Sequence, residues 1–318
     1  MTGYADVVAR KVRSSGGANG STLALWVVRS TGVSTSPVLT GQVTGTRTIA
    51  QFAQLNPGLL PARAALVALI GVQVSSPGAH NNPVTGHDST GSKSPCVAPS
   101  NPADDTAAVS APTAVLSDGQ NGYLQTAGGD PDGTKETSTF ASWSSLYNAT
   151  RIDWPGLLGG NFFPDYMVTN ASPLSAWPAA GNTNYPVVYV PRDALGNNQD
   201  IVIPAGVRRG MLVVTGNVLL QANSEWDGII LAGGNLTVSS ACDDVNSPIC
   251  YLRGMVVTGL NIALGQSVPR DAVPRFGKHG DKGSAYVQWA WCYTHSSIGT
   301  FSALVPVKNG WADTWSTY

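Results

Sequence analysis

The sequence repeats one short pattern three times, and this repeat limits the possible folds more than any other feature. Residues 210–220 read GMLVVTGNVLL, residues 228–238 read GIILAGGNLTV, and residues 254–264 read GMVVTGLNIAL. Each copy begins with a glycine and places an asparagine seven positions later. Apolar residues alternate after the asparagine, which predicts a strand, a tight turn and a second strand in each copy. The glycines are Gly210, Gly228 and Gly254, and the asparagines are Asn217, Asn235 and Asn261.

Equivalent positions of the repeat indicate how its copies are arranged. In a hairpin meander consecutive strands are antiparallel and equivalent positions do not stack, whereas in a parallel solenoid they lie about 4.8 Å apart. The residues before the three glycines are Arg209, Asp227 and Arg253, so stacking would alternate their charges. The asparagines would form a second column in which each side chain bonds the next. We therefore predict a mainly β fold built on a short parallel β-solenoid (β-helix).

Cysteine spacing fits this repeat. Successive glycines of the repeat are 18 and 26 residues apart, and the eight additional residues match the loop CDDVNSPIC. We predict that a disulfide between Cys242 and Cys250 closes this loop. Cys96 and Cys292 remain and can pair with each other, although four cysteines allow three pairings. An even cysteine count in this composition favours an oxidising compartment.

Composition restricts the class of protein further. Charged residues make up only 12% of the chain, and 36 glycines and 21 prolines suit β-structure with many turns better than a helical bundle. A net charge of −1 gives no overall attraction to nucleic acid or to an anionic membrane. The longest apolar run, at 64–72, is too short to cross a bilayer. We expect an extracellular or cell-surface protein, with any leader or anchor removed or outside this sequence.

Three regions are expected along the chain: an N-terminal β region, a solenoid and a C-terminal cap. Residues 1–60 contain a strand-like stretch at 21–28 and are expected to form an N-terminal β region. Residues 61–268 are expected to hold the solenoid, interrupted by a large irregular, loop-rich excursion at about 77–200 with a helix at 138–150.

Further segments complete the predicted solenoid. The apolar stretch 65–76 lacks the asparagine but otherwise alternates, so we expect it to pack against residues 201–264 across the excursion. Residues 269–318 are expected to form a C-terminal cap, because an uncovered last coil invites further pairing. We predict a strand at 284–293 within this cap. The tryptophans expected to contribute to it are Trp289, Trp291, Trp311 and Trp315.

Few residues indicate chemistry. Asp130, Asp132 and Glu136 lie around a glycine and are candidate calcium ligands, but the other carboxylates of an EF-hand are absent, and a solvated turn is the alternative. No nucleophile elbow, zinc-protease motif or phosphate loop is present, and no catalytic pair of carboxylates can be assigned. The aromatic residues of 151–189 either cover the solenoid or form an exposed binding patch. We expect no enzymatic activity and no cofactor other than calcium.

A family resemblance covers about residues 150–318 and extends only loosely to 1–76. The run GVRRGMLVVTGNVLLQANSEWDGIILAGGNLTV, then GMVVTGLNIALGQ and the C-terminal FSALVPVKNGWADTWSTY, resembles the C-terminal region of bacterial PilX-type pilus-assembly-associated proteins, which are minor-pilin-like. The resemblance implies an envelope or extracellular location, association with type IV pilus-like filaments and no known catalysis. This sequence differs from the family in lacking the N-terminal apolar helix and the prepilin leader.

Together these patterns predict a non-enzymatic extracellular structural protein that assembles into, or decorates, a pilus-like surface filament. Its partners would be copies of itself or other filament subunits, with a glycan or other surface ligand as a further candidate. Two alternatives stay open: a carbohydrate-binding adhesin that uses the aromatic stretch, and a carbohydrate-active β-helix enzyme, which needs a cleft with clustered acids.

Overall fold

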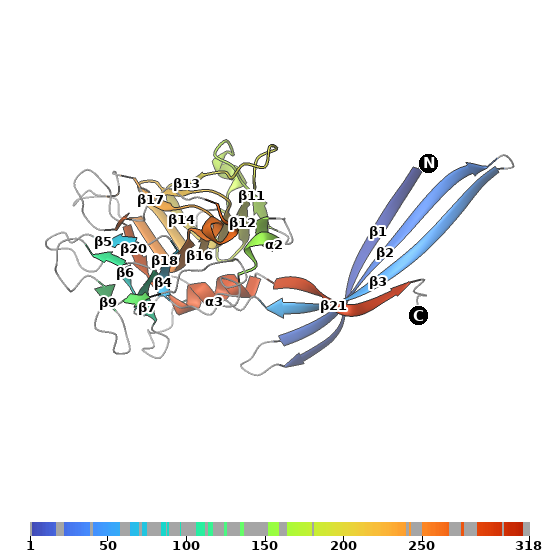
Figure 1. The fold of residues 1–318 in the computed structure, drawn as a ribbon, viewed down its shortest axis with the longest axis horizontal. Coiled ribbons are helices and arrows are strands. Elements are labelled where there is room, and N and C mark those ends of the chain that lie inside the picture. The colour runs from blue at the N-terminus through green and yellow to red at the C-terminus, as the bar shows by residue number, and fades with distance from the viewer. Residues whose placement is uncertain are drawn as a thin grey trace. The chain divides into compact units, whose positions relative to one another are not determined.

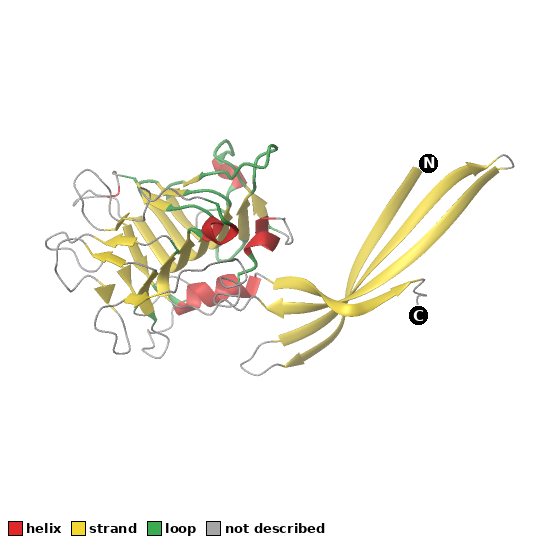
Figure 2. Cartoon of the chain, viewed as in Figure 1, coloured by secondary structure: helices red, strands yellow, loops and turns green. Residues whose placement is uncertain are grey.

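The computed structural model divides the chain into two compact units. The sheet unit comprises Met1–Leu59 and Ser302–Tyr318, and the parallel unit comprises Leu60–Phe301. Strands predominate in both units (Figure 2). The residues that the structure describes are 2–16, 22–38, 41–57, 64–69, 72–74, 84–86, 88, 96, 106–111, 114–116, 124–125, 134–136, 152–158, 164–179, 181–239, 242, 250–266, 275–276, 285–300 and 302–313.

The sheet unit is a four-stranded antiparallel sheet (Figure 1). Its strands are β1 (Thr2–Gly16), β2 (Thr22–Val38), β3 (Gly41–Pro57) and β21 (Ser302–Asp313), and their order is β1-β2-β3-β21. The strand predicted at 21–28 lies in β2 from Thr22 onward. The sequence predicts that residues 269–318 cap the solenoid, whereas the structure pairs β21 with β3. This pairing satisfies backbone groups along one edge of β3, which a cap over the solenoid would leave without a partner.

Apolar residues are exposed on both faces of this sheet. Val7 and Val8 are consecutive in β1, so they lie on opposite faces, and they are 62% and 43% exposed. Ile49 of β3 is 43% exposed and lies on the same face as Val7, with Ser30 between them. At these positions the sheet leaves apolar surface in contact with solvent.

The parallel unit contains three sheets of parallel strands. Its strands are β4 (Ala64–Ala68), β5 (Val72–Val74), β6 (Val84–Thr85), β7 (Ala107–Ala111), β8 (Ala114–Leu116), β9 (Leu124–Gln125), β10 (Thr134–Glu136), β11 (Tyr166–Met167), β12 (Val187–Val190), β13 (Ile201–Ile203), β14 (Gly206–Val214), β15 (Val218–Leu220), β16 (Ser224–Ala232), β17 (Leu236–Val238), β18 (Cys250–Thr258), β19 (Arg275–Phe276) and β20 (Ala285–Gln288). The largest sheet has the order β10-β7-β4-β18-β16-β14-β12-β11, with β20, β6 and β9 branching from β18. The other two are β13-β15-β17 and β19-β5-β8.

The sequence repeat forms parallel strands in one register. β14, β16 and β18 pair so that Gly210, Gly228 and Gly254 are neighbours, and β15 pairs with β17 at the equivalent offset. From β13 to β18 the chain alternates between the large sheet and the β13-β15-β17 sheet. The parallel arrangement predicted from the sequence is confirmed, and a hairpin meander is excluded for these strands.

The third copy of the repeat departs from the pattern after β18. The sequence predicts a strand around residues 262–264, but Leu260–Leu264 forms a 3-10 helix, η5. Gly259 and Gly265 flank it with φ of 81° and 75°, and the left-handed conformation that these values represent suits glycine. The chain therefore leaves the strand conformation between these two glycines, which flank the 3-10 helix.

The first part of the segment 65–76 packs against the repeat, as predicted, whereas β5 in its second part pairs with β8 and β19. β4 pairs with the second half of β18, and β7 and β10 continue the large sheet beyond β4. The sequence predicts a loop-rich excursion at 77–200, whereas strands β6 to β12, a 3-10 helix η3 (Leu174–Ala176) and helix α2 (Trp154–Leu158) lie within it. These strands have two to five residues, too few for a clear period. The helix predicted at 138–150 lies outside the described residues.

Helix α3 (Trp291–Thr300) lies against β14, β16 and β18. The sequence predicts a strand over 284–293, but only β20 is a strand there, and the helix begins at Trp291. The Trp291 backbone N–H donates to Asp88 Oδ1 at 2.8 Å, which satisfies a group that the first helical turn leaves unpaired. Two disulfides are present, Cys242–Cys250 and Cys96–Cys292, and both pairings agree with the prediction.

The tryptophans expected in the C-terminal cap lie in different parts of the structure. Trp289 is buried in the core of the parallel unit, whereas Trp291 on α3 is 40% exposed. Trp311 lies in β21 of the sheet unit, and Trp315 lies outside the described residues. Trp289 and Trp291 therefore belong to the parallel unit, and Trp311 belongs to the sheet unit.

Candidate functional site

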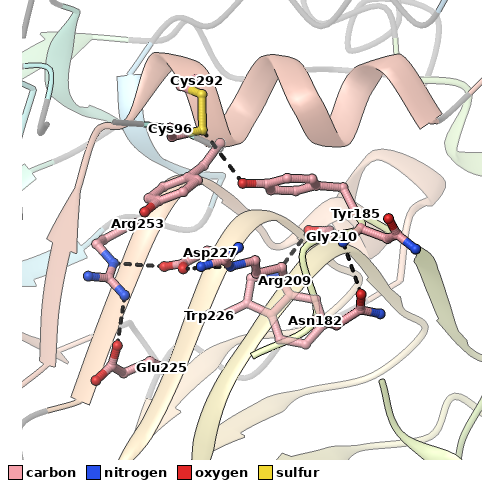
Figure 3. A network of polar contacts seen from close by, with 12 residues as sticks. Cys96, Asn182, Tyr185, Arg209, Gly210, Glu225, Trp226, Asp227, Arg253 and Cys292 are labelled. Carbon is pink, nitrogen blue, oxygen red and sulfur yellow. Dashed lines mark hydrogen bonds and ion pairs between the residues drawn. A yellow bond between two sulfur atoms is a disulfide. The ribbon is translucent and has the colours of Figure 1, made fainter. Parts of the chain in front are cut away.

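A column of charged residues crosses the large sheet of the parallel unit (Figure 3). In the shared register of β14, β16 and β18, Arg209, Asp227 and Arg253 are neighbours. Arg209 Nε lies 3.4 Å from Asp227 Oδ2, and Arg253 Nε lies 2.7 Å from Asp227 Oδ1. The alternation of charge predicted from the sequence is confirmed, and one carboxylate serves two arginines.

Glu225 adds a fourth charge that the repeat pattern does not single out. It precedes Asp227 by two positions, which places it on the same face of β16, and Arg253 Nη2 donates to Glu225 Oε2 at 2.7 Å. The Asp227 side chain is 0% exposed, whereas 24% of the Glu225 side chain is exposed. A buried charge without a partner is strongly destabilising. Here the two positive charges of the arginines are balanced by the two negative charges of the carboxylates.

Two tyrosines and helix α3 cover the column. Tyr293 of α3 is fully buried, and the Arg253 guanidinium carbon lies 5.8 Å from its ring centroid. The ring centroid of Tyr185 lies 6.3 Å from that of Tyr293, and its hydroxyl lies 3.6 Å from Cys96 Sγ. The Cys96–Cys292 disulfide holds α3 beside these groups (Figure 3).

Burial shifts the ionisation of residues around the column. It raises the pKa of Tyr185 to about 12, although the Arg209 charge acts in the opposite direction. Burial also raises the pKa of Tyr293, and the Asp227 charge adds to this effect. For Arg253, burial acts to lower the pKa, but the Asp227 charge and hydrogen bond and the Glu225 charge outweigh it, so the pKa is raised. The two tyrosines are therefore neutral and Arg253 is charged at physiological pH.

The glycines that follow the column bend each strand at the same level. Gly210, Gly228 and Gly254 have φ of 119°, 137° and 135°, a region that residues with a side chain rarely adopt. A Cβ at Gly228 would overlap Gly210 O and Ser297 Oγ. Trp226 Nε1 donates to Gly210 O at 3.0 Å. Close stacking of the strands and of α3 thus requires glycine here.

The asparagine column forms only in part. Asn217 Oδ1 accepts a hydrogen bond from the backbone N–H of Asn235 at 2.8 Å. The Asn235 side chain is buried, and its two polar atoms have no hydrogen-bond partner among the described residues. Asn261 lies in η5, where its side chain donates to Thr215 O and accepts from Trp154 Nε1, both at 2.9 Å. The predicted ladder, in which each amide side chain bonds the next, is therefore wrong.

Two tryptophans of the aromatic stretch 151–189 are core residues. Trp154 of α2 is 0% exposed and bonds Asn261, and Trp177 is 5% exposed. The Arg208 guanidinium carbon lies 5.9 Å from the Trp177 ring centroid. Of the two roles that the sequence leaves open for aromatic residues of 151–189, these two cover the sheet core, and a glycan site built on them is excluded.

The candidate calcium ligands are not gathered in the described part of the chain. Asp130 and Asp132 lie outside it, and Glu136 is the last residue of β10. Among the described residues, no group of three or more His, Cys, Asp or Glu side chains is placed to hold a metal ion. The described residues thus supply no geometry for calcium binding.

The charged column fixes the register of the strands. Asp227 is shielded from solvent and shared by two arginines, so it is not offered to a ligand. A shift of β16 by one residue would move Asp227 to the opposite face and leave the arginines without it. The column therefore disfavours a one-residue change of register, because the change would separate the buried charges.

Comparison with known proteins finds no match: no family model, no curated protein and no solved structure is similar to this chain. The resemblance to PilX-type proteins accordingly stays a prediction. Among the described residues, no helix combines the length and the apolar character needed to span a membrane.

Proposed function

We propose that the chain is a non-enzymatic extracellular structural protein that assembles into, or decorates, a pilus-like surface filament. The observation that carries this proposal is the sheet unit, whose outer strands β1 and β21 each pair with one neighbour among the described residues. The open edge of such a strand presents backbone groups that can pair with another chain. At 15 and 12 residues, these are not the very short edge strands that limit such pairing.

We also propose that the parallel unit is a short β-solenoid. The chain alternates between two sheets, and the 18-residue step from Gly210 to Gly228 adds one strand to each, as β14 and β15 are followed by β16 and β17. Stacking of equivalent strands gives a body in which each coil contacts its neighbours. Such a body, locked by a buried charge column, suits a subunit that keeps its shape outside the cell.

Disulfides and charge support the extracellular location. The two disulfides persist most readily in an oxidising compartment. A net charge of −1 gives copies of the chain little mutual repulsion, which favours self-assembly over a nucleic-acid partner. The resemblance to PilX-type pilus-assembly-associated proteins supports the same location and the same kind of assembly.

A concentration series of the oxidised full chain tests assembly. We expect light scattering to show masses above the 32.9 kDa of one chain and negative-stain electron microscopy to show filaments. We also expect the protein in filament preparations from the surface of its source cells. A chain that stays monomeric at high concentration and is missing from those preparations would overturn the proposal.

Val7→Pro and Val8→Pro are matched variants of the open edge. Backbone N–H groups of consecutive strand residues point to opposite sides, so one proline removes a bond to β2 and the other removes a donor at the open edge. We expect the variant whose proline removes the donor at the open edge to keep the wild-type circular dichroism spectrum and to lose assembly. Undiminished assembly of both variants would contradict an edge contact through β1.

A further inference from the structure

The first part of β1 has a regular open edge. β1 pairs with β2 without interruption from Thr2 to Lys11, and a register shift follows between Lys11 and Arg13. Among the described strands, β1 pairs with no other. A bulge disturbs pairing on both sides of a strand, so only the stretch up to Lys11 is suited to accept a further strand.

The sequence of this stretch is complementary to itself. Residues 6–10 read Asp-Val-Val-Ala-Arg. In an antiparallel pair of two such strands centred on Val8, position 6 of each copy lies opposite position 10 of the other. An aspartate then faces an arginine twice, and Val8 faces Val8 at the centre. Cross-strand pairs of opposite charge stabilise a sheet, whereas like charges directly opposite destabilise it.

We propose that β1 binds β1 of a second copy of this chain in an antiparallel pair centred on Val8. The twofold axis makes the contact self-complementary, and the two sheets join into one of eight strands. Because the register shift ends regular pairing at Lys11, symmetry limits the contact to residues 5–11. Val7 and Val8, now 62% and 43% exposed, lie at the middle of this contact and lose solvent exposure in it.

The edge of β21 is a poorer partner for β1. Pro306 interrupts it, since proline has no backbone N–H, and its register with β3 shifts between Pro306 and Trp311. Both features disfavour a continuous ladder on that edge. The observations therefore favour β1 of a second copy.

The inference rests on the open edge used for the proposed function and names its partner. A twofold contact closes on itself, so a filament needs a second, different contact between copies. Dimers without filaments would therefore overturn the filament and leave the β1 contact standing. Filaments that are unaffected by changes in β1 would overturn the β1 contact alone.

Charge exchange between positions 6 and 10 tests the contact. The assembly state of the oxidised full chain is measured by analytical ultracentrifugation for wild type, Asp6→Arg, Arg10→Asp and the double variant. Each single variant places like charges opposite each other twice, so we expect its dimer dissociation constant to rise by about tenfold or more. The double variant restores both pairs in exchanged positions, and we expect it to recover the wild-type constant.

Arg29→Asp is the matched control. Arg29 lies opposite Val8 on the central strand β2, one strand away from the open edge, and the change in charge equals that of Arg10→Asp. We expect this variant to dimerise like wild type, with circular dichroism verifying the fold of every variant. Monomeric wild type at high concentration, wild-type dimerisation of both single variants, or failure of the double variant to recover would each overturn the proposal.

Discussion

The two units hold their strands together in opposite ways. In the parallel unit, residues such as Leu212 and Ile230 are fully buried, and the Asp227 carboxylate at the centre of the column is paired with arginines and shielded from solvent. In the sheet unit, Val7, Val8 and Ile49 are exposed, and residues 27–33 of the central strand β2 are only partly buried. The parallel unit has a buried core of its own, whereas the sheet unit leaves apolar surface exposed and two strand edges unpaired among the described residues.

The sequence explains this difference. The strands of the repeat carry continuous apolar runs, such as Met211 to Val214, which suit parallel strands buried on both faces. β1 mixes valine with aspartate, arginine and lysine, and Asp6 and Arg10 fall on the same face as Val8, so that face is not suited to a dry core. We therefore propose that the parallel unit is specified internally and that the sheet unit is completed by association.

The largest expected effect comes from Asp227→Ala. The substitution leaves the buried Arg209 without its carboxylate and leaves Arg253 with Glu225 alone, so the free energy of unfolding of the parallel unit should fall by about 3–5 kcal/mol. Chemical denaturation measures this loss. Glu225→Gln is the control, since its partly exposed pair should contribute only about 0–1 kcal/mol. Equal losses of unfolding free energy for the two variants would contradict the view that the buried charges around Asp227 specify the fold of the parallel unit.

The next largest contrast between the two units is expected when one glycine in each is replaced by alanine. Gly228→Ala places a Cβ against Gly210 O and Ser297 Oγ at a φ of 137°, so we expect a loss of about 3 kcal/mol in the free energy of unfolding. In Gly32→Ala on β2 the new Cβ meets only Arg47 O, at 4.0 Å, so we expect no loss or a gain of up to about 1 kcal/mol. Thermal unfolding of both variants checks the contrast, which similar losses would contradict.

The two disulfides should differ in their contribution to the parallel unit. Replacing Cys96 and Cys292 by alanine opens a separation of 196 residues, and replacing Cys242 and Cys250 opens one of 8. Loop entropy predicts losses of about 3–5 and about 2–3 kcal/mol in the free energy of unfolding. Denaturation of the two double variants measures both losses. The reverse order would mean that Cys96–Cys292 does not hold α3 on the sheet in the way described.

A smaller effect distinguishes two asparagines of the repeat. Asn261→Ala leaves Trp154 Nε1 and Thr215 O without their bonds, so we expect a loss of about 1–3 kcal/mol in the free energy of unfolding. Asn235→Ala removes a side chain that bonds none of the described residues, so its loss should be below about 1 kcal/mol. Thermal melts compare them. A larger loss for Asn235 would restore the amide ladder predicted from the sequence.

The smallest expected effect depends on pH. The pKa of Tyr185 is raised to about 12 in the folded chain, against about 10 in an unfolded one, so folding favours its neutral form. The resulting stability is present below about pH 10 and is lost as the pH rises toward 12. In Tyr185→Phe the melting temperature should fall less steeply over this interval. Parallel pH profiles for wild type and variant would show that burial of Tyr185 is not maintained in solution.

Much of the parallel unit could be predicted because its cause is local and periodic. Aligning the repeat predicts the glycines in one register, the alternating charges at 209, 227 and 253, and the cysteines that flank one inserted loop. Glu225 could have been found by the same alignment, since it shares a face of its strand with Asp227. The exit of the third copy into η5 was signalled only by Gly259 and Gly265, which also suit an ordinary turn.

The sheet unit was harder to predict because its pairing is remote in sequence. The strand in 302–313 begins with an apolar run at 303–307 that is also compatible with a cap, and its position beside β3 depends on tertiary pairing across more than 200 residues. The short strands of the predicted excursion were missed for a similar reason. Strands of two residues, such as β6 and β9, acquire strand geometry only from a neighbour that is already in place.

Hydrogen exchange measured by mass spectrometry at low and high protein concentration tests the contrast between the units most directly. If the sheet unit is completed by association, backbone amides of residues 2–16 will become more protected as the concentration rises. Those of β14, β16 and β18 will exchange equally slowly at both concentrations, because their protection comes from within the chain. Protection of β1 that does not change with concentration, or protection of the parallel strands that does, would contradict the account.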